Sequence, residues 1–451
     1  MTRSLAAVAR EVRGRLIGQD ATFEAVSTDT RSLSRGALFV ALRGENFDGN
    51  RFVPEAQARG AAGALVSEPS PLPLPQVEVA DTRLAFGRMA SAWRDNFELP
   101  VIAITGSAGK TTVKELTASI LGLKREICVT AGNLNNDIGV PLTLMGMDAD
   151  DQALVIELGA NHAGEIDYLS SLVQPTVGVI TNAAAAHLEG FGSLRGVAVA
   201  KGELLDHLPR AGTSVLNADD PFIGDWLARA RTEFVATFGL SEQADCRPVG
   251  AIDSDAQGAR FRMRLPDATE LDIELPLLGE RNVVNACAAA AACLAVGVTP
   301  EDIVAGLARA TAVPGRMRAF RGVNAATIVD DSYNANPASV LAALDYLAGL
   351  RGERILVLGD MAELGAEGPG LHAEIGTAAR SRCDALLSIG DLAAHAAEAY
   401  GPGAEHFDTL DELERALQAR LSSKTTVLIK GSRVMGLDRL AAALRARVES
   451  A

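Results

Sequence analysis

Residues 101–112, with the sequence VIAITGSAGKTT, constrain the fold of this chain more than any other segment. An apolar, β-branched run over 101–105 predicts a strand, and the pattern from Lys110 onward predicts a helix. The turn between them contains only small residues, which let backbone N–H groups converge on a phosphate beside the positive end of the helix dipole. The residues of this turn are Gly106, Ser107, Ala108 and Gly109.

The residues directly after the turn suit the same ligand. Lys110 can bring a positive charge to the β- and γ-phosphates, and the hydroxyl of Thr111, next to Thr112, can reach Mg²⁺. The spacing is G-x-x-G-K-T, because Ile104 stands where the longer phosphate-loop pattern has its first glycine. We therefore predict nucleotide binding. The alternative is an ordinary glycine-rich turn between a strand and a helix.

The length and charge of the chain limit its organisation and its partners. It has 451 residues, a formal net charge of −15 and 48% hydrophobic residues. At ~150 residues per domain, we expect about three domains with cores of their own. The acidic balance argues against nucleic acid or an anionic membrane surface as the main partner.

Cysteine usage and the N-terminal pattern indicate the compartment. The five cysteines form no C-x-x-C pair, which favours reduced thiols. The N-terminus lacks the basic and apolar pattern of a signal peptide, and no apolar run has the length of a membrane span. We therefore expect a cytoplasmic protein without membrane insertion.

Short apolar runs predict an α/β fold in three domains over residues 1–98, 99–313 and 314–451. The first is a small α/β domain with strands at 37–42, 63–66 and 76–79 and a helix at 52–59. The second begins at the phosphate loop, and its strands at 153–158, 176–181 and 213–216 alternate with helices in a parallel sheet covered on both faces. The third is a Rossmann-like α/β domain with strands at 326–329, 354–358, 385–389 and 425–429, each followed by a helix.

Polar residues of the second domain offer several candidate ligands. Glu157 ends a predicted strand, where a carboxylate can hold Mg²⁺ on the phosphates or simply be solvated. His187 comes after another strand end and is either a ligand or a structural histidine. Lys201 lies in a predicted helix, where a lone lysine is usually solvated. Asn282 and Asn285 share a helix face, where their amides bind a nucleotide base or cap an Ala-rich helix predicted at 283–296.

Polar clusters also come after three strands of the third domain. Asp330 and Asp331 precede an Asn-Pro turn, where they bind a ribose hydroxyl or cap the next helix. Asp360 and Glu363 come after the strand RILVL, and Lys430-Gly431-Ser432-Arg433 come after the strand VLI. Because the carboxyl ends of parallel strands share one edge of a sheet, the three clusters predict one crevice for substrate and nucleotide.

The chain resembles the Mur ligases of peptidoglycan synthesis over nearly its whole length. The resemblance is carried by GSAGKTTVKE, GNLNNDIGVPLTL, ELGANHAGEI, TNAAAAHLEGFGS, AKGELL, DDSYNANPAS, LGDMAELG and KGSR, and in the first domain by STDTR and FVALRGENFDGN. It implies a monomeric ligase that uses ATP and Mg²⁺ and acts through an acyl phosphate. The motifs DDSYNANP and ELGANHAGEI imply that it joins D-alanyl-D-alanine to UDP-N-acetylmuramoyl-tripeptide.

The resemblance also implies roles for individual residues. The residues from Gly106 to Thr112 would bind the ATP phosphates, with Lys110 catalytic. Thr111, Glu157, His187 and Lys201 would bind Mg²⁺. His187 and Lys201 would also be catalytic, and Lys201 would act as a carbamate.

Further contacts are implied by the same resemblance. ATP contacts are implied for Asn282, Asn285, Arg316 and Asp331. Substrate contacts are implied for Thr30, Arg31, Asp48, Gly49, Asn334 and Asn336, the first four to the UDP-sugar in the N-terminal domain. The chain departs from the family at Arg281, where histidine commonly precedes Asn282, so the contact to adenine or ribose at that position stays open.

Two other functions remain compatible with the motifs. A P-loop switch or motor ATPase would hydrolyse ATP without a carboxylate acceptor. A folylpolyglutamate-type ligase would share the phosphate loop and the chain beyond it, and the domain that precedes the loop speaks against it. Whether the third residue of the acceptor peptide is diaminopimelate or lysine stays open.

Overall fold

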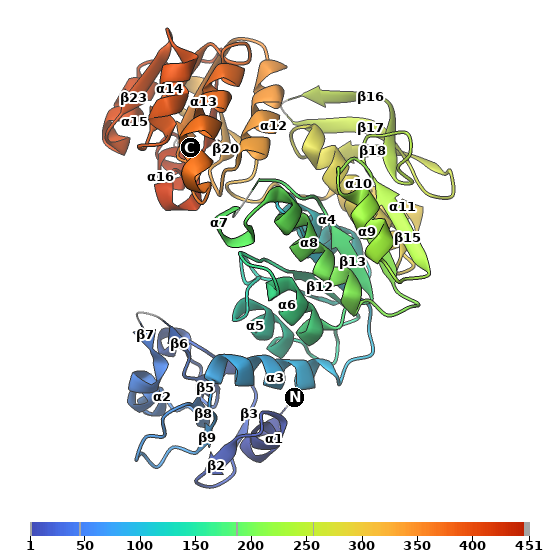
Figure 1. Ribbon diagram of the computed structural model, residues 1–451, viewed down its shortest axis with the longest axis vertical. Helices are drawn as coiled ribbons and strands as arrows, with labels where there is room; N and C mark the ends of the chain where they lie inside the picture. The colour runs from blue at the N-terminus through green and yellow to red at the C-terminus, as the bar shows by residue number, and fades with distance from the viewer. Residues whose placement is uncertain (1, 45–46, 186–187, 256, 446–451) are drawn as a thin grey trace, which may run out of the picture.

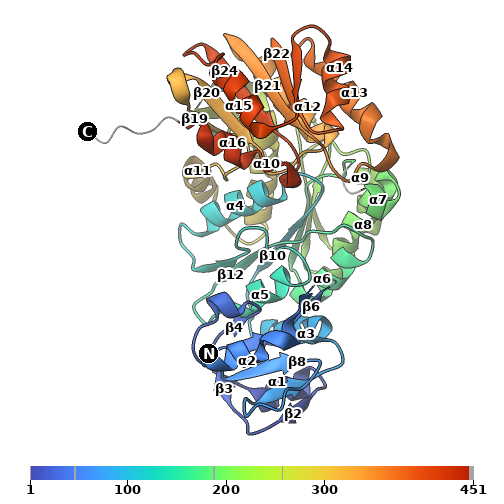
Figure 2. The same cartoon turned by 90° about the vertical axis from the view of Figure 1, so that its left-hand side faces the viewer.

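The computed structural model describes residues 2–44, 47–185, 188–255 and 257–445, so the predicted residue His187 lies outside the described residues. The chain forms three α/β units stacked along the long axis of the molecule, as Figure 1 and Figure 2 show. The N-terminal unit lies at one end, the unit with the phosphate loop in the middle, and the C-terminal unit at the other end. This arrangement confirms the predicted α/β fold of three units.

The central unit is built on a six-stranded sheet in the order β11-β12-β10-β13-β14-β15, and all its neighbouring strands are parallel. Its strands are β10 (Val101–Thr105), β11 (Ile127–Val129), β12 (Ala153–Glu157), β13 (Val177–Ile180), β14 (Thr213–Asn217) and β15 (Phe234–Phe238). The predicted strands are confirmed, whereas β11 and β15 at the two edges were not predicted. β11 has three residues, and β15 exposes Phe234 and Val235, so neither has the apolar run of a central strand.

Helices cover both faces of this sheet, as predicted. Side chains of β10 alternate between two cores: Ile102 and Ile104 face one, and Val101 and Ala103 face the other. The first core is covered by α4 (Lys110–Leu121), α10 (Glu280–Leu294) and α11 (Pro300–Ala308). The second is covered by α5 (Gly139–Met145), α6 (Glu165–Val173), α8 (Leu194–Gly202) and α9 (Ile223–Arg229), with the short α7 (Leu188–Phe191) beside α8.

A three-stranded antiparallel sheet, which the parallel pattern did not predict, extends the central unit. It consists of β16 (Arg247–Asp255), β17 (Gly258–Arg264) and β18 (Glu270–Leu275). Phe261 and Met263 on β17 are buried toward α10, while Arg260 and Arg262, which alternate with them, are exposed and pair with acidic residues of neighbouring strands. This one-sided alternation is typical of an antiparallel sheet that has one face in water.

The N-terminal unit has a five-stranded sheet in the order β2-β9-β8-β5-β4. Its strands are β2 (Arg15–Ile17), β4 (Val26–Ser27), β5 (Leu38–Val40), β8 (Gly63–Val66) and β9 (Gln76–Glu78). Two short pairs join β1 (Arg3–Ser4) to β3 (Thr22–Phe23) and β6 (Arg43–Gly44) to β7 (Phe47–Asp48), and the first two helices are α1 (Leu5–Glu11) and α2 (Val53–Ala58). The strands and the helix predicted for this region are confirmed within two residues at each end.

Helix α3 (Thr82–Arg94) joins the N-terminal unit to the central one. It packs against α5 and α6, as Figure 1 shows. The indole of Trp93 donates to the carbonyl of Met147 at 3.2 Å, and the guanidinium of Arg94 donates to the carbonyl of Val173 at 3.0 Å. Both contacts are buried, so the two units share a fixed interface.

The C-terminal unit has a six-stranded sheet in the order β19-β20-β24-β21-β22-β23, parallel except for β19. Its strands are β19 (Arg318–Arg321), β20 (Thr327–Asp331), β21 (Glu353–Gly359), β22 (Ala385–Ile389), β23 (Ala404–Phe407) and β24 (Thr425–Lys430). Its helices are α12 (Pro337–Ala348), α13 (Gly368–Ala379), α14 (Ala393–Tyr400), α15 (Leu410–Gln418) and α16 (Asp438–Ala443). The four predicted strands are confirmed, and the last of them, β24, lies between β20 and β21.

No helix in the described parts of the chain is both long enough and apolar enough to cross a membrane.

Candidate active site

The turn between β10 and α4 has the conformation of a phosphate-binding loop. Gly106 and Gly109 have φ values of 141° and 85°, which L side chains rarely adopt. A Cβ atom on Gly106 would collide with the hydroxyl of Thr181, and one on Gly109 would lie 2.6 Å from Oδ1 of Asn285. Both glycines are therefore required by backbone conformation and by close packing, and α4 begins directly after them with its free amides toward the loop.

Asn182, the second residue after β13, fixes the outer part of the loop. Its carbonyl accepts from the amide of Ser107 at 2.9 Å, and its Oδ1 accepts from the amide of Ala108 at 3.0 Å. Its Nδ2 donates back to the carbonyl of Ala108 at 3.0 Å. The loop is thus positioned by a neighbouring strand end, and the first turn of α4 supplies the amides that remain for an anion.

Lys110 lies inside the loop that precedes it. Its Nζ donates to the carbonyl of Gly106 at 2.8 Å. Burial lowers the pKa of this lysine, while the charge of Glu157 acts in the opposite direction. A desolvated ammonium whose partner is a neutral carbonyl lacks a compensating negative charge, so the phosphates of a nucleotide would attract it strongly.

Glu157 is buried at the end of β12, so the alternative of a solvated strand end is wrong. One carboxylate oxygen accepts from the hydroxyl of Thr111 at 2.7 Å, and the other accepts from Nδ2 of Asn135 at 2.7 Å. A hydroxyl and a carboxylate beside a phosphate loop are hard oxygen donors of the kind that Mg²⁺ takes together with nucleotide phosphates. The donor set therefore fits Mg²⁺. Asn135, in the motif GNLNNDIGV, is a site residue to which sequence reasoning gave no role.

Lys201 is buried on α8, with an exposed fraction of 2%, so the solvated-lysine alternative is wrong as well. Burial lowers its pKa to about 7, and the charge of Lys110 acts in the same direction. Its Nζ lies 3.5 Å from the carbonyl of Ala160 and 5.2 Å from the ring centroid of Phe191. A lysine with this pKa is largely a neutral amine above neutral pH, which is the nucleophilic form.

Asn282 and Asn285 lie in the first turns of α10 and are linked to each other. Nδ2 of Asn285 donates to Oδ1 of Asn282 at 3.0 Å, and Nδ2 of Asn282 donates to the carbonyl of Leu278 at 2.8 Å. Asn282 therefore holds the backbone that precedes α10 and does not cap the helix, because the N-cap residue is Gly279 and no side chain in the described parts of the chain bonds to the first amides of α10. Asn285 contacts the phosphate loop at Gly109.

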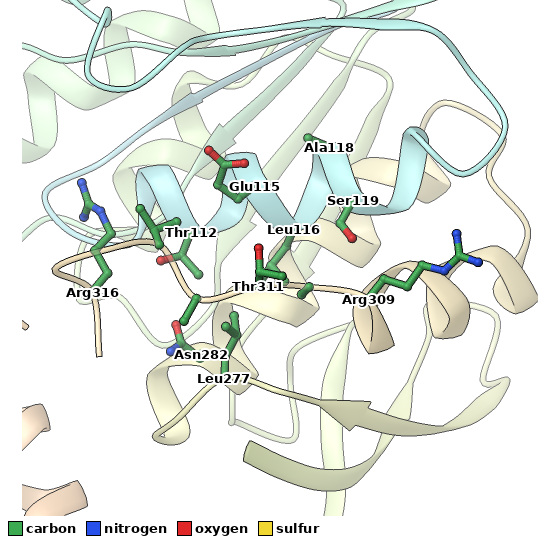
Figure 3. Close-up of a pocket in the computed structure, with 13 residues that line it drawn as sticks. Thr112, Glu115, Leu116, Ala118, Ser119, Leu277, Asn282, Arg309, Thr311 and Arg316 are labelled. Carbon is green, nitrogen blue, oxygen red and sulfur yellow. The ribbon is translucent and has the colours of Figure 1, made fainter. Parts of the chain in front are cut away.

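A small cavity of about 140 Å³ runs along α4 next to these amides. Figure 3 shows Thr112 on α4, Asn282 on α10 and the segment with Thr311 around it, with Arg316 at the end near Thr112. The guanidinium of Arg316 lies over the ring of Tyr333, with 4.2 Å between its carbon and the ring centroid, and its buried Nε has no hydrogen-bond partner among the residues that the structure describes. Amide, hydroxyl and guanidinium groups thus surround a space suited to a flat polar ring.

Asp330 and Asp331, which are adjacent in β20, have different surroundings. The carboxylate of Asp330 accepts from the amide of Gly315 at 3.1 Å and from the hydroxyl of Ser332, which fixes the loop between the central and C-terminal units. The carboxylate of Asp331 accepts from the buried Lys430 at 2.6 Å and from the amide of Met317 at 3.1 Å. Asp331 lines a large cavity between these two units, and Asp330 stabilises the backbone behind it.

The residues Asn334 and Asn336 continue the same loop. Lys430 also donates to the carbonyl of Asn334 at 2.9 Å. The side chain of Asn336 accepts from the amide of Ser339 at 2.8 Å and caps α12 in a capping box. Its amide group is thus engaged in helix capping, although the residue faces the cavity.

The large cavity, of about 1010 Å³, brings most of these residues together. The predicted residues that line it are Gly106, Ser107, Ala108, Gly109, Lys110, Thr111, Thr112, Glu157, Lys201, Asn282, Asn285, Arg316, Asp331, Asn334 and Asn336. Arg281, which replaces the histidine common in the family, also lines it. Its guanidinium donates to the carbonyl of Ala338 at 2.8 Å and so links α10 to α12 of the other unit.

The remaining four predicted residues lie in the N-terminal unit, on turns directly after strands. Thr30 and Arg31 form a short 3-10 turn after β4, where Asp29 pairs with Arg31 at 2.7 Å. Asp48 ends β7 and caps a second 3-10 turn that begins at Gly49, and a Cβ on Gly49 would lie 2.5 Å from the carbonyl oxygen of Leu42.

A parallel sheet with a phosphate loop, closed by a second α/β unit over a shared polar cavity, defines a nucleotide-dependent enzyme of three units. Comparison with known families gives the class a name. Residues 22–94 match the catalytic domain described for the Mur ligase family, residues 104–293 match the Mur ligase middle domain, and residues 315–433 match the Mur ligase, glutamate ligase domain. The chain belongs to the Mur ligase family.

Individual relatives match over their full length. The chain is 44% identical to the UDP-N-acetylmuramoyl-tripeptide–D-alanyl-D-alanine ligase of Escherichia coli K12 over 96% of each chain. It superimposes on a crystal structure of MurF from Acinetobacter baumannii with a TM-score of 0.92 and 36% identity over 98% of each chain. A MurF ligase from Thermotoga maritima in complex with ADP matches with a TM-score of 0.84 and 25% identity, over 93% of this chain and 96% of that one.

Proposed function

We propose that this chain is an ATP-dependent ligase that joins D-alanyl-D-alanine to UDP-N-acetylmuramoyl-tripeptide. The relatives that match over their full length carry this activity in their names, and a structural neighbour holds ADP. The single observation that carries the proposal is the shared cavity. It places the phosphate loop, Lys110 and Glu157 of the central unit opposite Asp331 and the polar strand ends of the C-terminal unit. Such a cavity can hold ATP and a carboxylate acceptor at the same time.

The first step activates the carboxylate of the tripeptide. One of its oxygens forms a bond to the γ-phosphorus while the bond from that phosphorus to the β–γ bridging oxygen breaks, which leaves ADP and an acyl phosphate. Catalysis of such a transfer rests on positioning and charge neutralisation, which Lys110 and the amides of α4 supply. Thr111 and Glu157 would hold Mg²⁺, which neutralises charge that develops on the phosphate oxygens.

The second step forms the amide bond. The neutral amine of the dipeptide attacks the acyl carbon, the carbon–oxygen bond to the phosphate breaks, and the amine nitrogen loses a proton. The lowered pKa of Lys201 supports a role for this residue as a carbamate, because it leaves a neutral amine that can react with CO₂. The carbamate would be an anionic oxygen donor next to the metal ligands in place of a cation.

We further propose a division of labour among residues 1–98, 99–313 and 314–451. The first range would hold the UDP-sugar through Thr30, Arg31, Asp48 and Gly49. The second would hold ATP, with the base in the small cavity at Asn282, and the third would contribute Asp331, Asn334 and the acceptor site. The fixed interface of α3 supports this division, because it sets the distance from the UDP-sugar to the phosphate loop.

The proposal is tested by measuring phosphate release in the presence of UDP-muramoyl-tripeptide and D-alanyl-D-alanine, together and singly. A ligase releases phosphate in proportion to the amide product, and only with both substrates present. Phosphate release that does not depend on either substrate would instead support a switch ATPase. Phosphate release that requires folate and glutamate would support the folylpolyglutamate alternative. Parallel reactions with the diaminopimelate and lysine tripeptides identify the acceptor.

We also infer that the protein acts in the cytoplasm as a monomer. ATP and a UDP-linked precursor are cytoplasmic metabolites, and all five cysteines are free thiols in the structure. Every predicted nucleotide ligand that the structure describes comes from one chain, so the cavity needs no second subunit. Light scattering of the protein during size-exclusion chromatography gives the mass that tests the monomer.

A further inference from the structure

The shared cavity contains more positive charges than the nucleotide needs. Among the described residues that line it, the cationic ones are Lys110, Lys201, Arg281, Arg316, Lys430 and Arg433. The acceptor dipeptide brings one more anion into the cavity, because its carboxylate stays ionised while its amine reacts. An ionised carboxylate is costly to bury unless it is paired with a cation. One of these six residues is therefore expected to be its partner.

Four of the six cations already have a partner or a role elsewhere. Lys430 is paired with Asp331 at 2.6 Å and has an exposed fraction of 2%. The guanidinium of Arg281 donates to the carbonyl of Ala338. Lys110 belongs to the phosphate loop, and Lys201 is buried on α8, where Lys110 is one of its charged neighbours. These four leave Arg316 and Arg433 for a further anion.

The position of Arg316 assigns it to the nucleotide. It lines the small cavity along α4 as well as the large one, next to Asn282. Arg433 lines the large cavity and not the small one, and it comes from the C-terminal unit. Both guanidinium groups are near the ring of Tyr333, at 4.2 Å for Arg316 and 5.7 Å for Arg433. The ring of Tyr333 is thus near both a cation of the nucleotide site and one without an assigned ligand.

Arg433 comes after β24, and β24 lies between β20 and β21 in the middle of its sheet. The strand order changes direction at this point, and open α/β sheets bind ligands in the crevice outside such strand ends. The backbone at Arg433 is fixed, because the amide of Ser432 donates to the carbonyl of Asp360 at 2.9 Å and its hydroxyl accepts from the amide of Ala362 at 2.8 Å. A guanidinium on this segment has a rigid base.

The ion pair that Arg433 forms in the structure is weak enough for a ligand carboxylate to replace it. Its guanidinium lies 3.4 Å from a carboxylate oxygen of Asp438, and the two side chains are 63% and 48% exposed. Pairs of this kind contribute little to stability. The neighbouring Val434 also lines the cavity and is 81% exposed, which is unusual for an apolar side chain. A guanidinium beside an exposed valine suits a ligand with a carboxylate next to a methyl group.

We propose that Arg433 binds the free carboxylate of D-alanyl-D-alanine, with Val434 against a methyl group of the dipeptide. This assignment rests on the proposed ligase function. An extended dipeptide measures roughly 7 Å from its amine to its carboxylate. The carboxylate site must therefore lie about one dipeptide length from the acyl carbon, which excludes the phosphate loop and favours the C-terminal unit. The guanidinium fork can hold both carboxylate oxygens, and a lysine cannot.

The test compares Arg433→Gln with the wild type on two acceptors, D-alanyl-D-alanine and its C-terminal amide. We expect the substitution to raise the KM for the dipeptide by about 10- to 100-fold, as for a lost charge-assisted bond, and to leave the KM for ATP unchanged. The wild type should discriminate against the amide by a similar factor, and Arg433→Gln should not discriminate. Arg433→Lys should give a smaller effect because it keeps the charge without the fork.

The matched control is Arg439→Gln, which removes an exposed arginine on α16 that does not line the cavity, and all its constants should stay at wild-type values. If the wild type makes product but Arg433→Gln retains its KM or still discriminates against the amide, the carboxylate assignment is wrong. If the wild type makes no product from the dipeptide, the ligase function itself fails. The two failures are thus distinguishable.

Discussion

The replacement of Lys201 by methionine tests the most unusual side chain of the site. The lysine has an exposed fraction of 2%, and burial lowers its pKa from 10.5 to about 7. Between these two values the folded protein binds fewer protons than the unfolded chain, so the stability of the wild type rises with pH across this window. The cost of losing the proton on folding is on the order of 4 kcal/mol at pH 7 and on the order of 2 kcal/mol at pH 9.

Methionine has a similar stem and no charge, so Lys201→Met removes this cost. We expect the variant to be more stable than the wild type by this margin at pH 7, with the difference roughly halved at pH 9. Thermal unfolding followed by circular dichroism at both pH values measures it. The control is Lys124→Met, at an exposed lysine that pairs with Asp302 at 2.8 Å, where we expect a small change that does not depend on pH.

Bicarbonate connects this measurement to catalysis. A carbamate forms only on the folded wild type, so bicarbonate with Mg²⁺ should raise the melting temperature of the wild type and not that of Lys201→Met. The variant should still bind ATP and should lose most of its ligase turnover, as should Lys201→Arg. Equal stability of wild type and variant at pH 7 would refute the desolvated lysine, and full turnover in the variant would refute the carbamate.

Three further results are expected. Lys110→Ala should lower turnover by about 10²-fold or more, because it removes the cation of the phosphate loop, whereas Lys124→Ala should not; near-normal turnover in the first would contradict the role of the loop. Glu157→Gln should raise the Mg²⁺ concentration needed for half-maximal activity and leave the melting temperature nearly unchanged. An unaltered Mg²⁺ dependence would show that Glu157 is not a metal ligand. Deletion of residues 1–81, which leaves α3 with its buried Trp93 on the central unit, should abolish ligation while calorimetry still detects ATP binding. Tight binding of UDP-muramoyl-tripeptide by the shortened protein would show that the N-terminal unit does not hold it.

The sequence predicts the parallel sheets well because their strands are buried on both faces. The run over 101–105 is continuously apolar, and the structure has β10 at Val101–Thr105. The antiparallel β16–β18 escaped prediction because only alternate residues are buried there, and charged residues such as Arg260 and Arg262 interrupt the apolar pattern. Continuous apolar runs thus identify strands with two covered faces, whereas a strand with one covered face, or a short strand at the sheet edge, gives no such run.

The candidate site was predictable where residue type and strand position agree, as at Lys110 and Glu157. Burial was not predictable for Lys201, because it depends on the packing of α8 against sequence-distant residues such as Ala160, whose carbonyl lies 3.5 Å from Nζ. The pairing of Lys430 with Asp331 likewise depends on the insertion of β24 beside β20, and the two residues are far apart in the sequence. Such pairs depend on the order of strands in a sheet, which local sequence does not specify.

The contact of Asn182 with the phosphate loop has a consequence for how the nucleotide is enclosed. The amides of Ser107 and Ala108 donate to this residue, so we expect the phosphate chain to be held by the other amides of the loop and of α4. A loop that contacted the terminal phosphate from every side would leave no path for an incoming nucleophile. Because Asn182 binds the amides on one side of the loop, we expect one side of the γ-phosphate to have no contact with the loop. The carboxylate at the end of a peptide can then approach the γ-phosphorus in line from that side.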